Sequence, residues 1–112
     1  MSANVYFSPI ITPENVVRLF QLAGKQLPGK VAIKLHSGEK GNQNFLRPEF
    51  WKPVIDFVGG TVVECNTAYE GERNVTERHV RLMADHGWSK YFDVDILDAV
   101  GPDLELSIPN GR

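Results

Sequence analysis

The stretch VAIKLHSGEKGNQNFLRPEF, from Val31 to Phe50, decides the fold class. Its first five residues are apolar or β-branched apart from Lys34, which is typical of a central strand. A glycine-rich polar loop follows, and Pro48 marks the start of a helix. In an open α/β sheet, ligand sites are built from loops that leave the carboxyl ends of strands. The stretch therefore predicts a strand, a site-forming loop and a helix in succession.

Helix and strand signals alternate along the rest of the chain. Thr12 before Pro13 is typical of a helix N-cap, and Asn74 followed three residues later by Glu77 resembles a capping box. Strand, helix and strand joined by short links favour parallel pairing through right-handed crossovers. The predicted helices span residues 13–23, 48–58 and 74–85, and the predicted strands span residues 5–7, 31–35, 61–65, 92–99 and 104–108. The sequence predicts a single three-layer α/β domain, residues 1–112, with a mainly parallel sheet.

Length and composition exclude several classes of function. With 112 residues the chain has the size of one small domain. A net charge of -2 gives no general attraction to phosphate backbones, so nucleic acid is not a predicted partner. The sequence shows no signal-peptide pattern and no apolar run of about eighteen residues, which predicts a cytoplasmic protein without a membrane partner. Cys65 is the only cysteine, so this chain alone provides neither a disulfide framework nor a four-thiolate metal site.

The loop after the first central strand carries candidate site residues. His36 follows its strand directly, and Gly38 and Gly41 allow backbone amides to turn toward an anion. In this interpretation His36, beside Glu39, is a hydrogen-bond donor or proton carrier, and Arg47 is a bidentate clamp for a carboxylate or phosphate. In the alternative, His36 merely caps its strand and Arg47 is a surface residue before a helix.

A second polar loop, Asn66 to Asn74, leaves the next strand in the same way. If the two strands are neighbours, the loops face one another and their polar groups surround one cleft. The alternative is an exposed loop shaped by Gly71 and by helix capping. The predicted site combines the catalytic candidates His36 and Glu39 with the ligand-binding candidates Asn42, Arg47, Asn66, Thr67, Tyr69 and Arg73.

Two histidines on the third predicted helix do not make up a metal site. His79 and His86 are seven residues apart and share a helix face, but no acid or thiolate at a matching position completes a ligand set. We therefore predict no metal ligands, and we expect these side chains to be solvated on the polar face of their helix.

Together with TVVECNTAYEGERN and HVRLMADHGW, the stretch from Val31 to Phe50 resembles the amino-terminal part of the family of uncharacterised iron-sulfur centre proteins (domain of unknown function 362). The resemblance covers roughly residues 5–112. Ser37 and Cys65 depart from it, because an aromatic or other large residue and a threonine or aspartate are expected there. The matching positions are His36, Gly38, Glu39, Gly41, Asn42, Arg47 and Pro48 in the first motif, and Asn66, Thr67, Tyr69, Gly71, Arg73 and Asn74 in the second.

The resemblance implies a fragment of a longer cytoplasmic protein that takes part in electron transfer or other redox chemistry. Such proteins hold 4Fe-4S clusters with clustered cysteines, so this chain would hold no cofactor and the cluster would lie in a missing part of the parent protein. The expected partners are a small anionic ligand and the remainder of the parent chain. Exposed apolar surface at the carboxyl-terminal end could also drive homo-oligomer formation. The alternative function is a non-catalytic ligand-binding or scaffold module, and the sequence leaves open whether the protein is an enzyme.

Overall fold

The computed structural model describes residues 3–24, 26–101 and 104–111. Its three strands form one sheet in the order β1-β2-β3, and both neighbouring pairs are parallel. This arrangement confirms the predicted α/β class and the parallel sheet. The elements in chain order are α1 (Pro13–Ala23), β1 (Ala32–Lys34), α2 (Pro48–Val58), β2 (Thr61–Glu64), α3 (Thr76–Asp85), the short 3-10 helix η1 (Trp88–Lys90) and β3 (Asp95–Ile96).

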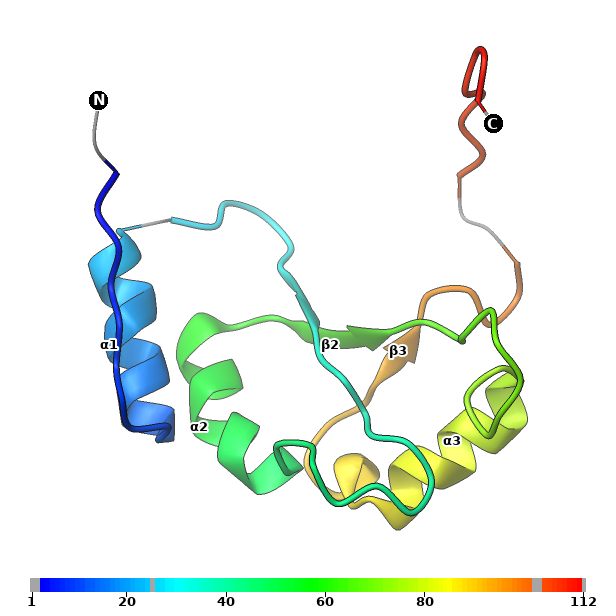
Figure 1. Cartoon of the computed structure of the whole chain (residues 1–112), viewed down its shortest axis with the longest axis horizontal. Coiled ribbons are helices and arrows are strands. Elements are labelled where there is room, and N and C mark those ends of the chain that lie inside the picture. Colours follow the sequence, from blue (N-terminus) through cyan, green and yellow to red (C-terminus); the bar gives the residue numbers. More distant parts are fainter. Residues whose placement is uncertain (1–2, 25, 102–103, 112) are drawn as a thin grey trace.

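Helices α2 and α3 lie on the same side of the sheet (Figure 1). Parallel strands that follow one another in chain order, joined by crossovers of one hand, place both connecting helices on one face. Helix α1 packs against α2, at the far end of the molecule from α3 (Figure 1). The described residues therefore build a sheet and one helical layer in place of the three layers expected from the sequence.

The starts of α1 and α2 follow the local sequence signals. Thr12 caps α1, since its Oγ1 accepts a hydrogen bond from the backbone N–H of Asn15 at 3.2 Å. Gly24 ends that helix in the left-handed conformation, with φ at 63°. Helix α2 begins at Pro48 and contains Pro53 in its interior. Both predicted helices are thus confirmed.

The start of α3 differs from the predicted capping box. The N-cap residue is Val75, which makes no side-chain capping hydrogen bond. The Oδ1 atom of Asn74 instead accepts a hydrogen bond from Arg78 Nη2 at 2.6 Å. The capping-box prediction was wrong because the arginine one turn later in the helix takes the oxygen that would have capped it.

Each of the five predicted strands is shorter than expected or is not formed, and the losses are largest in three of them. Residues 5–7 and 104–108 have no strand structure, and the strand predicted over residues 92–99 is confined to Asp95–Ile96. In Figure 1 the amino-terminal segment runs beside α1 and the carboxyl-terminal segment leads away from the body of the molecule. Alternating apolar and polar residues favour a strand only where a neighbouring strand can pair with the backbone.

The core lies between the sheet and its helical layer. Trp88 is 1% exposed, and its Nε1 donates a hydrogen bond to the carbonyl oxygen of Ser37 at 3.0 Å. This contact attaches the loop after β1 to the centre of the core. The buried apolar side chains of the cluster are Leu35, Phe45, Ile55, Val62, Met83, Trp88 and Ile96.

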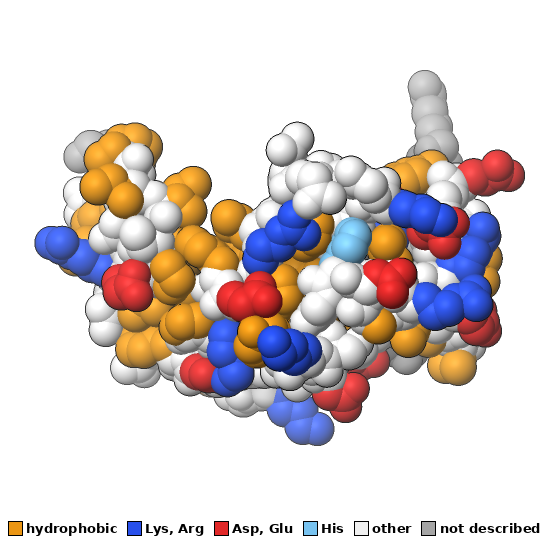
Figure 2. Space-filling model, turned by 90° about the horizontal axis from the view of Figure 1, so that it is seen from below, with side chains coloured by type: hydrophobic (Ala, Val, Ile, Leu, Met, Phe, Trp, Pro, Cys, Tyr) orange, Lys and Arg blue, Asp and Glu red, His pale blue; other side chains and the backbone are white. Residues whose placement is uncertain are grey.

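Hydrophobic side chains are exposed at the end of the molecule formed by α1 and α2. Figure 2 shows them gathered there, while charges of both signs are spread over the whole face. Phe7 and Ile11, both next to α1 in the sequence, are 82% and 70% exposed. In the part of the chain that the structure describes, no helix has the length and apolar character needed to cross a membrane.

We predict that Gly38→Ala destabilises the protein more than Gly41→Ala. Both glycines have positive φ, 91° and 75°, so both substitutions cost roughly 1–2 kcal/mol in backbone strain. Only at Gly38 would the added Cβ also lie 2.6 Å from the Phe45 ring, which adds about 1–3 kcal/mol of overpacking. Urea unfolding of the two variants measures the difference. Equal losses would contradict a close approach of Phe45 to Gly38.

Candidate functional site

The two predicted loops meet at the carboxyl ends of β1 and β2. Lys34 pairs with Val63 in parallel register, so both strands end at the same edge of the sheet. The Tyr69 hydroxyl donates a hydrogen bond to Glu39 Oε1 at 2.6 Å, and Arg73 Nη1 donates to the same oxygen at 2.9 Å. These contacts confirm that the loops face one another.

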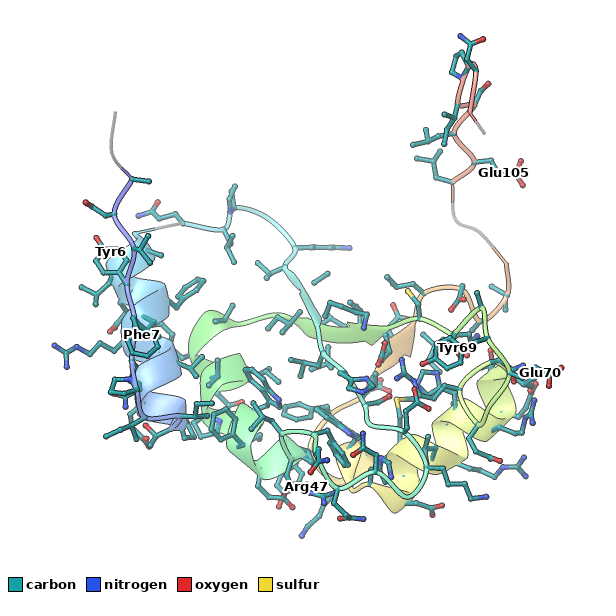
Figure 3. All side chains as sticks on the ribbon, in the orientation of Figure 1. Tyr6, Phe7, Arg47, Tyr69, Glu70 and Glu105 are labelled. Carbon is teal, nitrogen blue, oxygen red and sulfur yellow. The ribbon has the colours of Figure 1, made fainter. Side chains whose placement is uncertain are left out.

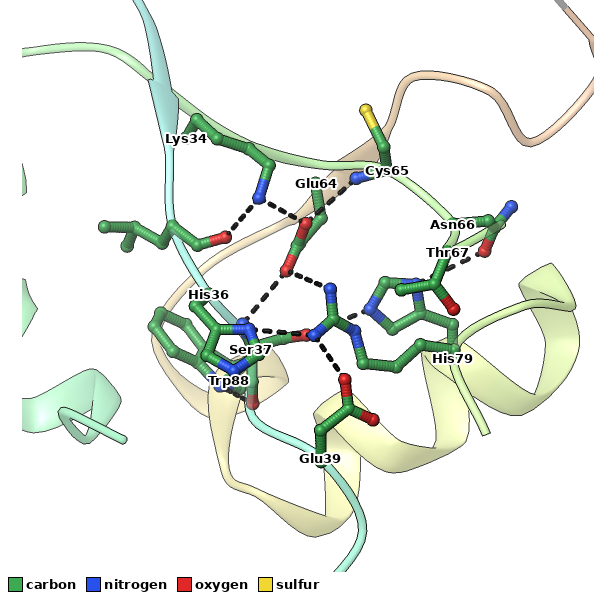
Figure 4. Close-up of polar contacts among 12 residues, drawn as sticks. Lys34, His36, Ser37, Glu39, Glu64, Cys65, Asn66, Thr67, His79 and Trp88 are labelled. Carbon is green, nitrogen blue, oxygen red and sulfur yellow. Dashed lines mark hydrogen bonds and ion pairs between the residues drawn. The ribbon is translucent and has the colours of Figure 1, made fainter. Parts of the chain in front are cut away.

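A buried carboxylate, that of Glu64 at the end of β2, joins the two loops, and its side chain is only 2% exposed (Figure 4). Its Oε1 accepts hydrogen bonds from the backbone N–H of Ser37 at 3.0 Å and from Arg73 Nη2 at 3.4 Å. Its Oε2 accepts from the backbone N–H of Cys65 at 3.0 Å and lies 2.7 Å from Lys34 Nζ. Sequence reasoning missed Glu64, although an acidic residue at the end of an apolar strand is a signal that could have indicated it.

The surroundings of Glu64 favour its charged form. Burial alone would raise the pKa of this carboxyl, but hydrogen bonds from Lys34 and from the backbone of Ser37 and Cys65, together with the Lys34 charge, lower the pKa below its usual value. Glu64 is therefore an anion near neutral pH, with Lys34 and Arg73 as its cationic partners.

Arg73 stands at the centre of the cluster and is 6% exposed. Its Nη1 lies 2.8 Å from His36 Nδ1, and because a guanidinium only donates hydrogen bonds, His36 Nδ1 must accept. A neutral His36 therefore carries its proton on Nε2. The Nε–H of Arg73 is buried, and no described residue accepts a hydrogen bond from it. Buried donors are rarely left unpaired, since each costs roughly 1–3 kcal/mol.

A second hydrogen-bonded group, formed by Ser37, His79 and Asn66, links the two loops to α3. Ser37 Oγ lies 2.9 Å from His79 Nε2, and His79 Nδ1 lies 3.3 Å from Asn66 Oδ1 (Figure 4). The amide of Asn66 is oriented by the hydrogen bond from its Nδ2 to Thr76 Oγ1 at 2.9 Å. The proton of His79 is thus assigned to Nδ1, and the Ser37 hydroxyl donates to Nε2.

The order serine, histidine and asparagine resembles the relay of a hydrolase, but the burial of this group excludes that role for it as folded. Ser37 is 2% exposed and His79 is 0% exposed. The backbone N–H of Ser37 is bonded to Glu64 and its carbonyl accepts from Trp88. A substrate cannot reach the Ser37 hydroxyl, so the group fixes the positions of the two loops.

The burial of His79 also corrects the expectation that it would be solvated. His79 lies on the face of α3 that packs against the loops, where Ser37 and Asn66 contact its two ring nitrogens. Desolvation lowers the pKa of His79, and the nearby negative charge of Glu64 opposes this effect. His86 is half-buried as well, and its Nδ1 lies 3.0 Å from the Ser37 carbonyl oxygen.

Arg47 lies outside the cluster. Its guanidinium donates a hydrogen bond to Gln43 and is centred 4.2 Å from the middle of the Phe45 ring. Figure 3 shows Arg47 beside the start of α2, away from Tyr69. The structure therefore does not pair Arg47 with His36 as a clamp, because Arg47 stacks on Phe45 while Arg73 of the second loop contacts His36.

Two other predicted ligand-binding residues shape the loops. Asn42 Oδ1 accepts a hydrogen bond from the backbone N–H of Asn44 at 2.7 Å, which makes a local turn. Thr67 Oγ1 donates to the carbonyl oxygen of Tyr69 at 3.1 Å. The predicted residues that contact one another across the loops are His36, Glu39, Tyr69 and Arg73.

The described residues do not fit a metal centre. Within them, no three histidine, cysteine or acidic side chains come close enough to hold a metal ion. A 4Fe-4S cluster takes four cysteine thiolates, and the sequence contains one cysteine. This chain cannot hold such a cluster by itself.

No family model matches the sequence, and neither the curated proteins nor the solved structures give a significant match.

We predict that Glu64→Gln is strongly destabilising and weakens the acid sensitivity of the fold. Loss of the charge leaves buried Arg73 short of a counterion, and breaking such a pair costs about 3–5 kcal/mol. Because the folded pKa of Glu64 is lowered, its contribution to stability is present above the unfolded value of 4.5 and is lost as pH falls through the folded pKa. Unfolding free energies measured from neutral to acidic pH test both effects. An unchanged acid profile would show that Glu64 does not titrate as assigned.

We predict that His79→Gln flattens the stability profile below neutrality. The folded pKa of His79 is lowered from 6.5, so on acidification the unfolded chain takes up the proton first and the wild-type protein loses stability. Glutamine keeps hydrogen-bonding groups near Ser37 and Asn66 but does not titrate. Urea unfolding at about pH 7.5 and about pH 5.5 should show a smaller loss in the variant. Parallel profiles would contradict the assignment.

Proposed function

We propose that the cluster at the ends of β1 and β2 binds a small anion. The observation that supports this function most directly is the guanidinium of Arg73, whose Nη1 reaches the exposed His36 and the half-buried Glu39 where the two loops meet. A guanidinium in this situation is suited to an oxygen of a carboxylate or phosphate.

Exposed polar side chains surround Arg73. His36 is exposed, and the hydrogen bond from Arg73 fixes its Nδ1 as an acceptor, which leaves the Nε2 proton for a ligand. The Tyr69 side chain is exposed too, and the residue is 58% accessible. Lys34, with 55% of its side chain exposed, adds positive charge. His36 and Glu39 stay the catalytic candidates that the sequence predicts.

The proposal extends to the parent protein through the family resemblance alone. In that context the chain is the ligand-binding domain of a cytoplasmic iron-sulfur protein in electron transfer or redox chemistry. The cysteines for a cluster would belong to another part of that protein. This domain would then bind the small anionic substrate rather than the electron carrier.

A scaffold function is the second candidate, and the charge balance of the cluster favours it. Arg73 lies between the carboxylates of Glu39 and Glu64, and Lys34 also pairs with Glu64. Two cations and two carboxylates can hold the loops together without any ligand. In a scaffold, changes at these residues alter the stability of the protein, and the wild-type protein binds neither carboxylate nor phosphate.

We predict that His36→Ala weakens anion binding while Arg47→Ala does not. Loss of one hydrogen bond should raise the dissociation constant roughly two- to tenfold. Arg47 carries a full charge but lies outside the cluster, so its variant controls for general electrostatics. Amide chemical shifts during titration with acetate and with inorganic phosphate measure both constants. Equal weakening by both variants would count against this site, and no binding by the wild type would favour the scaffold.

A further inference from the structure

Glu39 is the more exposed of the two carboxylates in the cluster. Its side chain is 34% exposed, compared with 2% for Glu64 and 7% for Arg73. A single oxygen, Oε1, accepts the hydrogen bonds from Arg73 and Tyr69, and no described residue bonds to the other oxygen. Glu39 is therefore held by two side chains at one atom, and it can turn toward water without opening the core.

The contacts of Glu39 are those that a bound carboxylate would make. One carboxylate oxygen lies 2.9 Å from a guanidinium nitrogen and 2.6 Å from a phenolic oxygen, at the site where the two loops meet. We propose that Glu39 is a built-in competitor, occupying the place of a ligand carboxylate on Arg73 and Tyr69 until the ligand displaces it. This inference rests on the proposed function, and it names the ligand class as small carboxylates.

Charge explains why a carboxylate is favoured over a phosphate. Exchange of the Glu39 carboxylate for a ligand carboxylate leaves the charge opposite Arg73 unchanged. Glu64 stays in place, since it is buried and accepts hydrogen bonds from two backbone N–H groups. A phosphate dianion would bring additional negative charge next to this fixed anion, where like charges repel more strongly than in water.

Release of Glu39 requires only side chains to turn, because one oxygen of its carboxylate makes both contacts. Tyr69 is more than half exposed, so its hydroxyl can exchange partners in contact with solvent. The hydrogen bond to Glu39 raises the pKa of the Tyr69 phenol, which gives a spectroscopic measure of the contact.

The test compares Glu39→Gln with Glu72→Gln. Glu72 is on the second loop and pairs with Lys40 at 3.5 Å, so its variant makes the same change of charge without touching Arg73. We expect Glu39→Gln to bind acetate about fivefold or more tightly than the wild type, because it removes the competing carboxylate. The gain for inorganic phosphate should be smaller, and Glu72→Gln should leave acetate binding close to that of the wild type.

The results separate this inference from the proposed function. If the wild type binds acetate and Glu39→Gln binds it equally or more weakly, Glu39 is not a competitor and the inference is overturned. If none of the proteins binds acetate or phosphate, the proposed function fails, and the inference fails with it. Absorbance titration of Tyr69, identified by difference from Tyr69→Phe, gives a second measure. In Glu39→Gln its pKa should fall toward the ordinary value of 10.0, and an unchanged pKa would refute the contact.

Discussion

The buried carboxylate of Glu64 is the interaction on which the candidate site depends. It accepts hydrogen bonds from the backbone at the start of both loops and pairs with Lys34 and Arg73. A charge inside a protein is tolerated only when such partners replace its hydration. The same partners hold the loops at a fixed separation, because moving either loop would leave a buried carboxylate oxygen without its donor.

The exposure of the side chains in the cluster increases from Glu64 outward to Glu39. Glu64 and His79 are fully enclosed, Arg73 is almost so, and Glu39, Tyr69 and His36 reach the solvent. The polar groups of Glu64 and His79 find their hydrogen-bond partners within the protein, whereas one carboxylate oxygen of the more exposed Glu39 has no partner among the described residues. A rigid base with exchangeable groups above it is the arrangement that small-ligand sites need, since preorganised contacts reduce the entropy lost on binding.

Local sequence signals predicted part of this structure correctly. Thr12, Pro13 and Gly24 define α1 through backbone chemistry within one turn, and Pro48 does the same for the start of α2. The capping box predicted at Asn74 was wrong, because the side-chain oxygen of Asn74 accepts a hydrogen bond from Arg78, one turn later, instead of capping the helix. The strands predicted at residues 5–7 and 104–108 failed for a related reason, since their pattern requires a neighbouring strand that the fold does not supply.

The sequence by itself determined the α/β class, the parallel sheet and the two polar loops at strand ends, because these follow from short-range periodicity and from turn residues. Tertiary structure alone decided which polar residues meet. It brought His36, Glu39, Tyr69 and Arg73 together, left Arg47 outside, and buried His79 between Ser37 and Asn66. Those contacts join residues 13 to 42 positions apart in the chain, and the order and register of β1 and β2 bring them together. No local sequence pattern determines that register, because the register is set by the packing of the whole sheet against its helices.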